Sequence, residues 1–247
     1  MITEDHLYDQ DMLISKHNHE FMNDASFQRA YARGVRAAGT DFQWHWRVHV
    51  GLWAASCANQ LPGDFVECGV GKGFHSSAVM TALDWDMTGR TYYLLDTFSG
   101  IDARYVTPTE LAEGVLEKNR HATEIGLYPT GPDAVIENFS EWKNVRIIAG
   151  PVPDTLPQIH AKQIAYMHID MNCAPPEIAA ISYLWERLTP GALVLLDDYA
   201  YVGYRQQKLA MDEFAATRGV KVLSLPTGQG LIIKPPRQRW IRRILGR

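Results

Sequence analysis

Short, continuously apolar segments alternate with helical patterns from residue 65 onward, and this alternation constrains the fold more than any other feature. Segments that are apolar at every position are typical of parallel strands buried on both faces. Parallel strands need a crossover between them, usually a helix. The alternation therefore predicts a doubly wound α/β domain. The predicted strands are 65–68, 91–95, 145–149, 164–169 and 191–196, and the predicted helices are 74–84, 132–141, the very short 154–161, 175–188 and 203–218.

The two ends of the chain depart from this alternation. In VKVLSLPTGQGLIIKP two β-rich runs flank a turn, which indicates an antiparallel hairpin at the sheet edge. Residues 1–60 read as mostly helical, and residues 100–131 form a long insertion after the second strand. Ligands bind beyond the carboxyl ends of such strands, so both segments are candidates to roof the site. Trp44, Trp46 and Trp53 fit such a roof, core packing or a subunit contact equally well.

We expect three parts: a helical N-terminal lid or oligomer segment at 1–60, a catalytic domain at 61–236 and a basic tail at 237–247. The tail carries five arginines among apolar residues. At helical spacing it would be a basic amphipathic segment for a membrane surface or an acidic partner. A solvated end or an oligomer contact is the alternative.

Three glycines follow the first predicted strand in FVECGVGKGFHSS. Gly69 allows a sharp turn, Gly71 a close approach of ligand to backbone, and Gly73 the start of a helix against the sheet. The spacing is one residue short of the dinucleotide fingerprint, and Glu67 nearly abuts the first glycine. A carboxylate there repels a pyrophosphate and favours an ammonium or sulfonium group.

The second strand leads into Asp96 and Thr97, where an acid would bind a ribose diol. The alternative is that Asp96 caps a helix or is solvated. A ribose and a cationic amino-acid group, without a diphosphate, describe S-adenosylmethionine. His75 and Ser76 begin the next helix, where free amides favour the methionine carboxylate. For His75, a packed or surface position explains the residue equally well.

Three acids stand at the ends of two later strands: Asp170 after YMHI, and Asp197 with Asp198 after LVLL. Neighbouring parallel strands lie about 4.8 Å apart, so we expect these carboxylates to converge on one spot. Carboxylates this close repel one another unless a cation joins them, and hard oxygen ligands suit Mg²⁺. The alternative is that some of them cap the following helices.

Proton transfer has two candidates on the strand that ends in HID. Asp170 is the preferred acceptor of the proton of a substrate hydroxyl, directly or through water. His168 lies two residues earlier on the same strand face. It could be a base, but a histidine inside a buried strand is more often a hydrogen-bonded core residue.

Together these residues resemble the macrocin O-methyltransferase (TylF/MycF-type) family of class I S-adenosylmethionine-dependent methyltransferases. The resemblance runs from about Trp46 to Lys234. The motifs that carry it are GDFVECGVGKG, LLDTFSGID, GPVPDTLP, HIDMN, LTPGALVLLDDY and KLAMDEFAATRGVKVLSLPTGQGLIIK.

The resemblance implies a Rossmann-like, mostly parallel seven-stranded sheet with the terminal antiparallel hairpin, sugar hydroxyls as acceptors, Mg²⁺ dependence and a homo-oligomer. It places the metal ligands at Asp170, Asp197 and Asp198, and it adds Gly150 near the adenine. One departure concerns the acceptor, because relatives often carry a second acid where this chain has Asn172.

Composition excludes several classes of function. A net charge of −4 gives no reason to expect a nucleic-acid partner. Three cysteines without metal-ligand spacing suit a reducing compartment, and the N-terminus lacks the pattern of a secretory signal. No apolar run is long enough to span a bilayer. We therefore expect a cytoplasmic protein.

The sequence hypothesis is a Mg²⁺-dependent O-methyltransferase that acts on a hydroxyl of a small molecule, a sugar on a natural product or glycan. A catechol or phenol acceptor is the close alternative, because it offers the same pair of oxygens. A nicotinamide oxidoreductase is disfavoured by the glycine spacing and by Glu67. A non-catalytic cofactor-binding subunit is disfavoured by the three acids.

Overall fold

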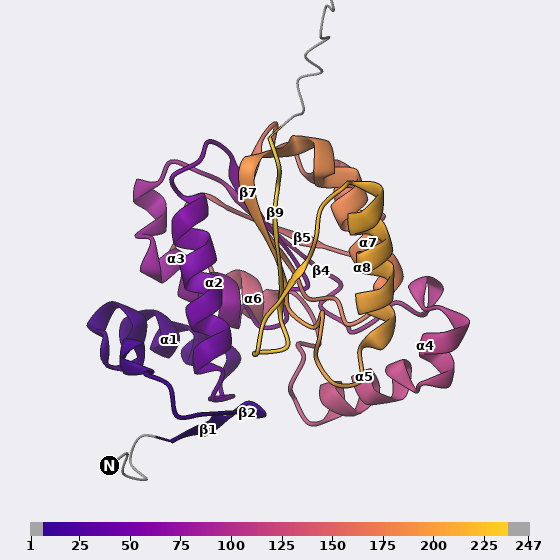
Figure 1. Cartoon of the computed structure of the whole chain (residues 1–247), viewed down its shortest axis with the longest axis horizontal. Coiled ribbons are helices and arrows are strands. Elements are labelled where there is room, and N and C mark those ends of the chain that lie inside the picture. Colours follow the sequence, from indigo (N-terminus) through magenta and orange to yellow (C-terminus); the bar gives the residue numbers. More distant parts are fainter. Residues whose placement is uncertain (1–6, 237–247) are drawn as a thin grey trace, which may run out of the picture.

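The computed structural model describes residues 7–236, which fold around one seven-stranded sheet with helices on both faces (Figure 1). The basic tail at 237–247 lies outside these residues. The sheet order is β5-β4-β3-β6-β7-β9-β8, with parallel pairing except at β9, which runs antiparallel to β7 and β8. This confirms the doubly wound fold and the antiparallel hairpin at the edge. The strands are β3 (Asp64–Cys68), β4 (Tyr92–Asp96), β5 (Val145–Ala149), β6 (Ile164–Ile169), β7 (Leu188–Leu196), β8 (Leu223–Ser224) and β9 (Gly230–Ile233).

Helices cover the sheet in two layers that bury alternate residues of each strand. On one face α1 (Ala25–Ala38), α2 (His45–Ala58) and α3 (Phe74–Ala82) lie together, and on the other α7 (Ala174–Leu184) pairs with α8 (Arg205–Thr217) (Figure 1). In β3, Phe65 packs into the core on the α2–α3 side, and Val66 packs into the core on the α7–α8 side. Both residues are fully buried, which explains why the strand is apolar at successive positions.

The N-terminal segment is less helical than its pattern predicts. Before α1 it contains a hairpin of β1 (Tyr8–Gln10) and β2 (Leu13–Ser15), followed by a short 3₁₀ helix, η2 (Glu20–Asn23). The hairpin lies at the same end of the molecule as α4 (Pro108–Ala112) and α5 (Val115–Glu124) of the insertion (Figure 1). Strands of three residues fall below the length at which sequence alternation is informative.

Other predicted helices are shortened where the chain cannot continue them. The predicted helix at 154–161 is wrong, because only a 3₁₀ turn forms there, at η5 (Leu156–Gln158). Pro151, Pro153 and Pro157 remove amide donors from this segment. The remaining elements are η3 (Trp85–Met87), η4 (Ala103–Tyr105), α6 (Asp133–Asn138) and η6 (Trp185–Arg187), the last of which continues α7.

The glycine loop between β3 and α3 depends on its first glycine for packing. Gly69 has a φ of +88°, and a Cβ on it would lie 1.8 Å from the carbonyl oxygen of Asp170. The chain just after β3 therefore packs directly against the backbone just after β6. Gly71 also has a positive φ, of +54°, but a Cβ there would meet nothing within 4 Å. The space beside Gly71 is open to a ligand, as its predicted role requires.

We predict that Gly69→Ala lowers the free energy of unfolding by about 3 kcal/mol or more, because it adds both a steric clash and backbone strain. Gly71→Ala is the matched control and should cost about 1 kcal/mol, since only the strain applies. Urea denaturation followed by circular dichroism measures both values. Equal losses in the two variants would contradict this account of the strand contact.

Candidate active site

A cavity of about 370 Å³ opens at the carboxyl ends of β3, β4, β6 and β7. Residues of the N-terminal segment, such as Trp44 and Val48, and of the insertion, such as Ile101 and Tyr128, contribute to its walls. Both segments therefore form walls of the cavity, as expected. The predicted site residues that line it are Glu67, Gly69, Gly71, His75, Asp96, Thr97, Gly150, Asp170, Asp197 and Asp198.

Ser76 is the exception among the predicted site residues. It is completely buried in the first turn of α3 and does not line the cavity. One helical residue advances the side-chain direction by about 100°, and here it turns Ser76 into the core. Its neighbour His75 lines the cavity. Its Nε2 lies 2.8 Å from the hydroxyl of Tyr166, and burial holds the pKa of His75 well below its usual value.

Asp96 determines the shape of the glycine loop. Its Oδ2 accepts hydrogen bonds from the amides of Val70 at 2.7 Å and Gly71 at 2.8 Å, and its Oδ1 accepts one from Phe98 at 2.7 Å. Burial raises the pKa of Asp96, and these amide hydrogen bonds oppose the rise. The carboxylate thus orders two loops rather than capping a helix, and it still lines the cavity.

Glu67 and His168 form a buried pair under the cavity floor. Their strands are neighbours, and the register of β3 and β6 places the two residues side by side. Nδ1 of His168 lies 3.0 Å from Oε1 of Glu67, and His168 Nε2 lies 3.7 Å from Oδ1 of Asp197. Burial alone lowers the pKa of His168, but these two acids outweigh it and raise the pKa to about 10.

His168 is buried and hydrogen-bonded to Glu67, which confirms the expectation of a hydrogen-bonded core histidine. Its raised pKa favours the imidazolium ion and disfavours a role as a base. Glu67 was expected to offer its charge to a cationic ligand, but much of that charge is engaged by His168. The cross-strand pairing explains the difference, because it depends on the sheet order rather than on the local motif.

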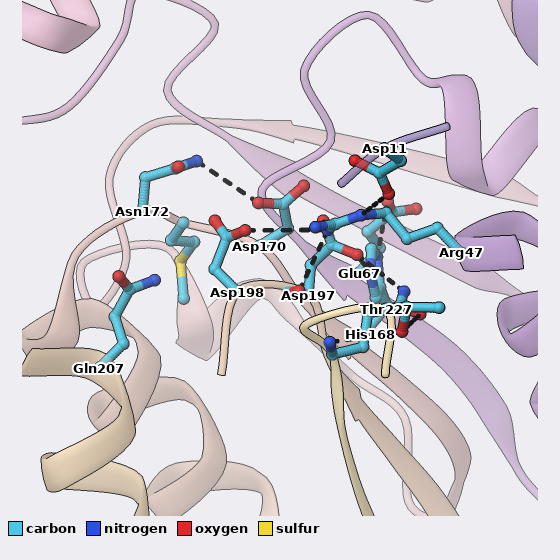
Figure 2. A network of polar contacts seen from close by, with 12 residues as sticks. Asp11, Arg47, Glu67, His168, Asp170, Asn172, Asp197, Asp198, Gln207 and Thr227 are labelled. Atoms are coloured by element: carbon cyan, nitrogen blue, oxygen red, sulfur yellow. Dashed lines mark hydrogen bonds and ion pairs between the residues drawn. The ribbon is translucent and has the colours of Figure 1, made fainter. Parts of the chain in front are cut away.

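The three acids at the strand ends have different environments (Figure 2). Arg47 and His168 hold the pKa of Asp197 well below its usual value, although burial raises it. Burial and the charge of Asp197 raise the pKa of Asp198 to about 7. Burial and the charges of both neighbours also raise the pKa of Asp170 well above its usual value. The Oδ1 of Asp170 accepts a hydrogen bond of 3.4 Å from Asn172.

Arg47 was not expected from the sequence and is the main cation of this cluster (Figure 2). It lies in the first turn of α2 and is 5% exposed. Its Nη1 donates to the Asp197 carboxylate and lies 3.8 Å from Oδ1 of Asp198, while its Nε donates to Asp11 at 3.0 Å. Its guanidinium also stacks over the ring of Tyr201, 4.6 Å from the centroid.

The expected convergence of the three carboxylates is incomplete. Within residues 7–236, no three His, Cys, Asp or Glu side chains come close enough together to hold a metal ion. Both carboxylate oxygens of Asp197 are also engaged, one by Arg47 and the other by Gln229 at 2.9 Å. The donor chemistry nonetheless fits a hard divalent cation. Asp170 and Asp198 are carboxylates whose raised pKa values reflect burial and repulsion that a cation would relieve.

A buried acid behind the cavity wall ties α7 to α8. Glu177 accepts a hydrogen bond from Gln207 at 2.8 Å and one from the Met171 amide at 3.3 Å. Burial raises the pKa of Glu177 to about 8. Between about pH 4.5 and 8 the unfolded chain loses this proton while the folded chain keeps it. The contribution of Glu177 to stability therefore falls as the pH rises through this window.

We predict that Glu177→Gln removes this loss. Relative to the wild type, the variant should gain about 3 kcal/mol of unfolding free energy between pH 5 and pH 8. Urea denaturation at the two pH values measures the difference. Glu213→Gln, at an exposed position of the same α8 helix, is the matched control and should show no such gain. A constant difference between Glu177→Gln and wild type would show that the native Glu177 is already ionised at pH 5.

The sequence profile described as macrocin O-methyltransferase (TylF) matches residues 49–223 of this chain. Among curated proteins, it is 26% identical over 212 residues to mycinamicin III 3''-O-methyltransferase of Micromonospora griseorubida, covering 78% of this chain and 80% of that one. It is 28% identical over 148 residues to 8-demethyl-8-(2,3-dimethoxy-alpha-L-rhamnosyl)-tetracenomycin-C 4'-O-methyltransferase of Streptomyces olivaceus, covering 58% and 55% of the two chains.

Among solved structures, the O-methyltransferase NovP superimposes with a TM-score of 0.69 at 18% identity. The superposition covers 89% of this chain and 100% of NovP. A calicheamicin methyltransferase superimposes with a TM-score of 0.59 at 16% identity, covering 88% and 94%. The fold is therefore that of the class I methyltransferases. The chain belongs to the macrocin O-methyltransferase family and is an S-adenosylmethionine-dependent O-methyltransferase.

Proposed function

We propose that this family member methylates a hydroxyl of a sugar on a natural product, with Mg²⁺ as its metal ion. The observation that carries the proposal is that one cavity is lined both by the glycine loop and by the acids of β6 and β7. The methyl donor and the substrate hydroxyl can thus meet inside this cavity. The names of two relatives support the acceptor class: one specifies the 3'' position of mycinamicin III, and the other specifies the 4' position of a tetracenomycin that carries a rhamnosyl group.

The part of the cavity lined by the glycine loop and the end of β4, which we call the donor half, suits S-adenosylmethionine. Gly71 leaves open space beside the loop, and Asp96 with Thr97 lies at the adjoining end of β4, where the ribose would bind. Gly150 follows β5 and would lie near the adenine. His75 is neutral because burial lowers its pKa, so it would contribute a hydrogen bond rather than a charge to the methionine carboxylate.

The part of the cavity lined by the acids of β6 and β7 would bind the substrate hydroxyl, and it supplies the group that takes the hydroxyl proton. The hydroxyl oxygen attacks the methyl carbon of the sulfonium, the carbon–sulfur bond breaks, and S-adenosylhomocysteine leaves as a neutral thioether. Asp170, which lines the cavity at the end of β6, takes the hydroxyl proton. Asp170, Asp197 and Asp198 would hold Mg²⁺, which when bound lowers the pKa of an acceptor hydroxyl.

No helix among the described residues is long and apolar enough to cross a membrane. A cytoplasmic location, a homo-oligomeric state and the division of the chain at residues 60 and 236 stay predictions from the sequence. Contact of the basic tail with a membrane surface also stays a prediction from the sequence.

We predict that Asp170→Asn lowers kcat at least 100-fold, because it removes the proton acceptor. The affinity for S-adenosylhomocysteine should change less than threefold, since the donor half is untouched. Methyl transfer to a sugar-bearing natural product and calorimetry measure the two quantities. Asp154→Asn is the matched control, because this acid lies outside the cavity and pairs with Arg104. Wild-type turnover in Asp170→Asn would refute its role.

The metal requirement has its own test. Removal of divalent cations with EDTA should lower turnover at least 100-fold, and added Mg²⁺ should restore it, because ionisation of the hydroxyl depends on the metal. Binding of S-adenosylhomocysteine should persist in EDTA. Unchanged turnover after EDTA treatment would eliminate Mg²⁺ and leave the proposed methyl transfer standing.

A further inference from the structure

Arg47 connects two parts of the chain that lie far apart in sequence. On one side its Nε donates to Asp11, which lies in the turn between β1 and β2. On the other side its Nη1 donates to the side chain and, at 3.1 Å, to the backbone carbonyl of Asp197. The side chains of Arg47 and Asp11 are only 6% and 7% exposed, so both ion pairs are largely screened from solvent.

The position of Arg47 conflicts with a divalent cation. A metal held by Asp170, Asp197 and Asp198 would share Asp197 with the guanidinium, and Asp198 lies 3.8 Å from it as well. Two positive groups this close repel strongly where water is scarce. Metal binding would also withdraw charge from the carboxylate that attracts Arg47. Each cation therefore weakens the hold of the other on Asp197.

We infer that Arg47 competes with the metal for Asp197 and that Asp11 draws Arg47 away from Asp197, so that metal binding at the acids and docking of the β1–β2 hairpin favour one another. The inference rests on the proposed metal dependence. Arg47 is a positioning residue in this scheme: it holds Asp197 before the metal binds and shifts toward Asp11 afterwards. By linkage, the metal strengthens the contact between Arg47 and Asp11 by the same factor by which this contact strengthens metal binding.

The two partners in this contact should have opposite effects on metal affinity. Arg47→Gln removes the competing positive charge, so Mn²⁺ should bind at least tenfold more tightly. Asp11→Asn removes the acid that draws Arg47 away, so Mn²⁺ should bind at least threefold more weakly. A purely structural role for the contact predicts that both variants change in the same direction, because both break the same ion pair.

The experiment is a titration of the whole protein with Mn²⁺ alone, followed by electron paramagnetic resonance of the free ion. Arg47→Lys is the matched control, because it keeps the charge and should bind Mn²⁺ within threefold of the wild type. If Arg47→Gln does not fold, Asp11→Asn and Arg47→Lys still test the inference. Hydrogen exchange of residues 7–15 gives the reciprocal readout: Mn²⁺ should slow exchange in the wild type and should not slow it in the double variant Arg47→Lys, Asp11→Asn.

The outcomes separate this inference from the proposed function. Opposite shifts in Arg47→Gln and Asp11→Asn support it, and shifts in the same direction, or none, overturn it. Mn²⁺ binding by Arg47→Gln but not by the wild type would support the competition and refute the metal requirement of the native enzyme. If no variant binds Mn²⁺, the inference is wrong, while binding of S-adenosylhomocysteine by the wild type would leave methyl transfer standing.

Discussion

A row of alternating charges holds the carboxyl edge of the sheet together. It runs from Glu67 on β3 through His168 on β6, Asp197 after β7 and Arg47 on α2 to Asp11 in the N-terminal hairpin. Each member contacts the next one of opposite sign, and all five are largely buried. Removal of one member from such a row leaves its neighbours buried without compensation, which costs more than a surface ion pair does.

The row also defines where chemistry can take place. Asp197 is compensated on two sides, by Arg47 and His168, and its pKa is low. Asp170 and Asp198 lie beside the row without an equivalent cation, and their pKa values are raised. The two carboxyl groups that retain their protons most strongly thus face the cavity. This asymmetry among three acids of the same type is what allows them to differ in role.

The sequence predicted what depends on local pattern. The strands, their acidic ends and the glycine loop were identified because fully buried parallel strands have a strong signature. Features that depend on tertiary pairing were missed: Arg47 and Asp11 meet across the fold, and Glu67 meets His168 only because β3 lies beside β6. The burial of Ser76 in the first turn of α3, outside the cavity lining, also depends on tertiary packing.

The hydrogen bonds of Asp96 have a consequence for protein engineering. The amides of Val70 and Gly71 are ordered by a side chain that belongs to a different strand, and Gly69 fits only against the backbone of a third. The conformation of the loop therefore depends on residues that lie outside the loop. Grafting FVECGVGKG into another α/β scaffold would reproduce its conformation only if the ends of the two flanking strands were grafted with it.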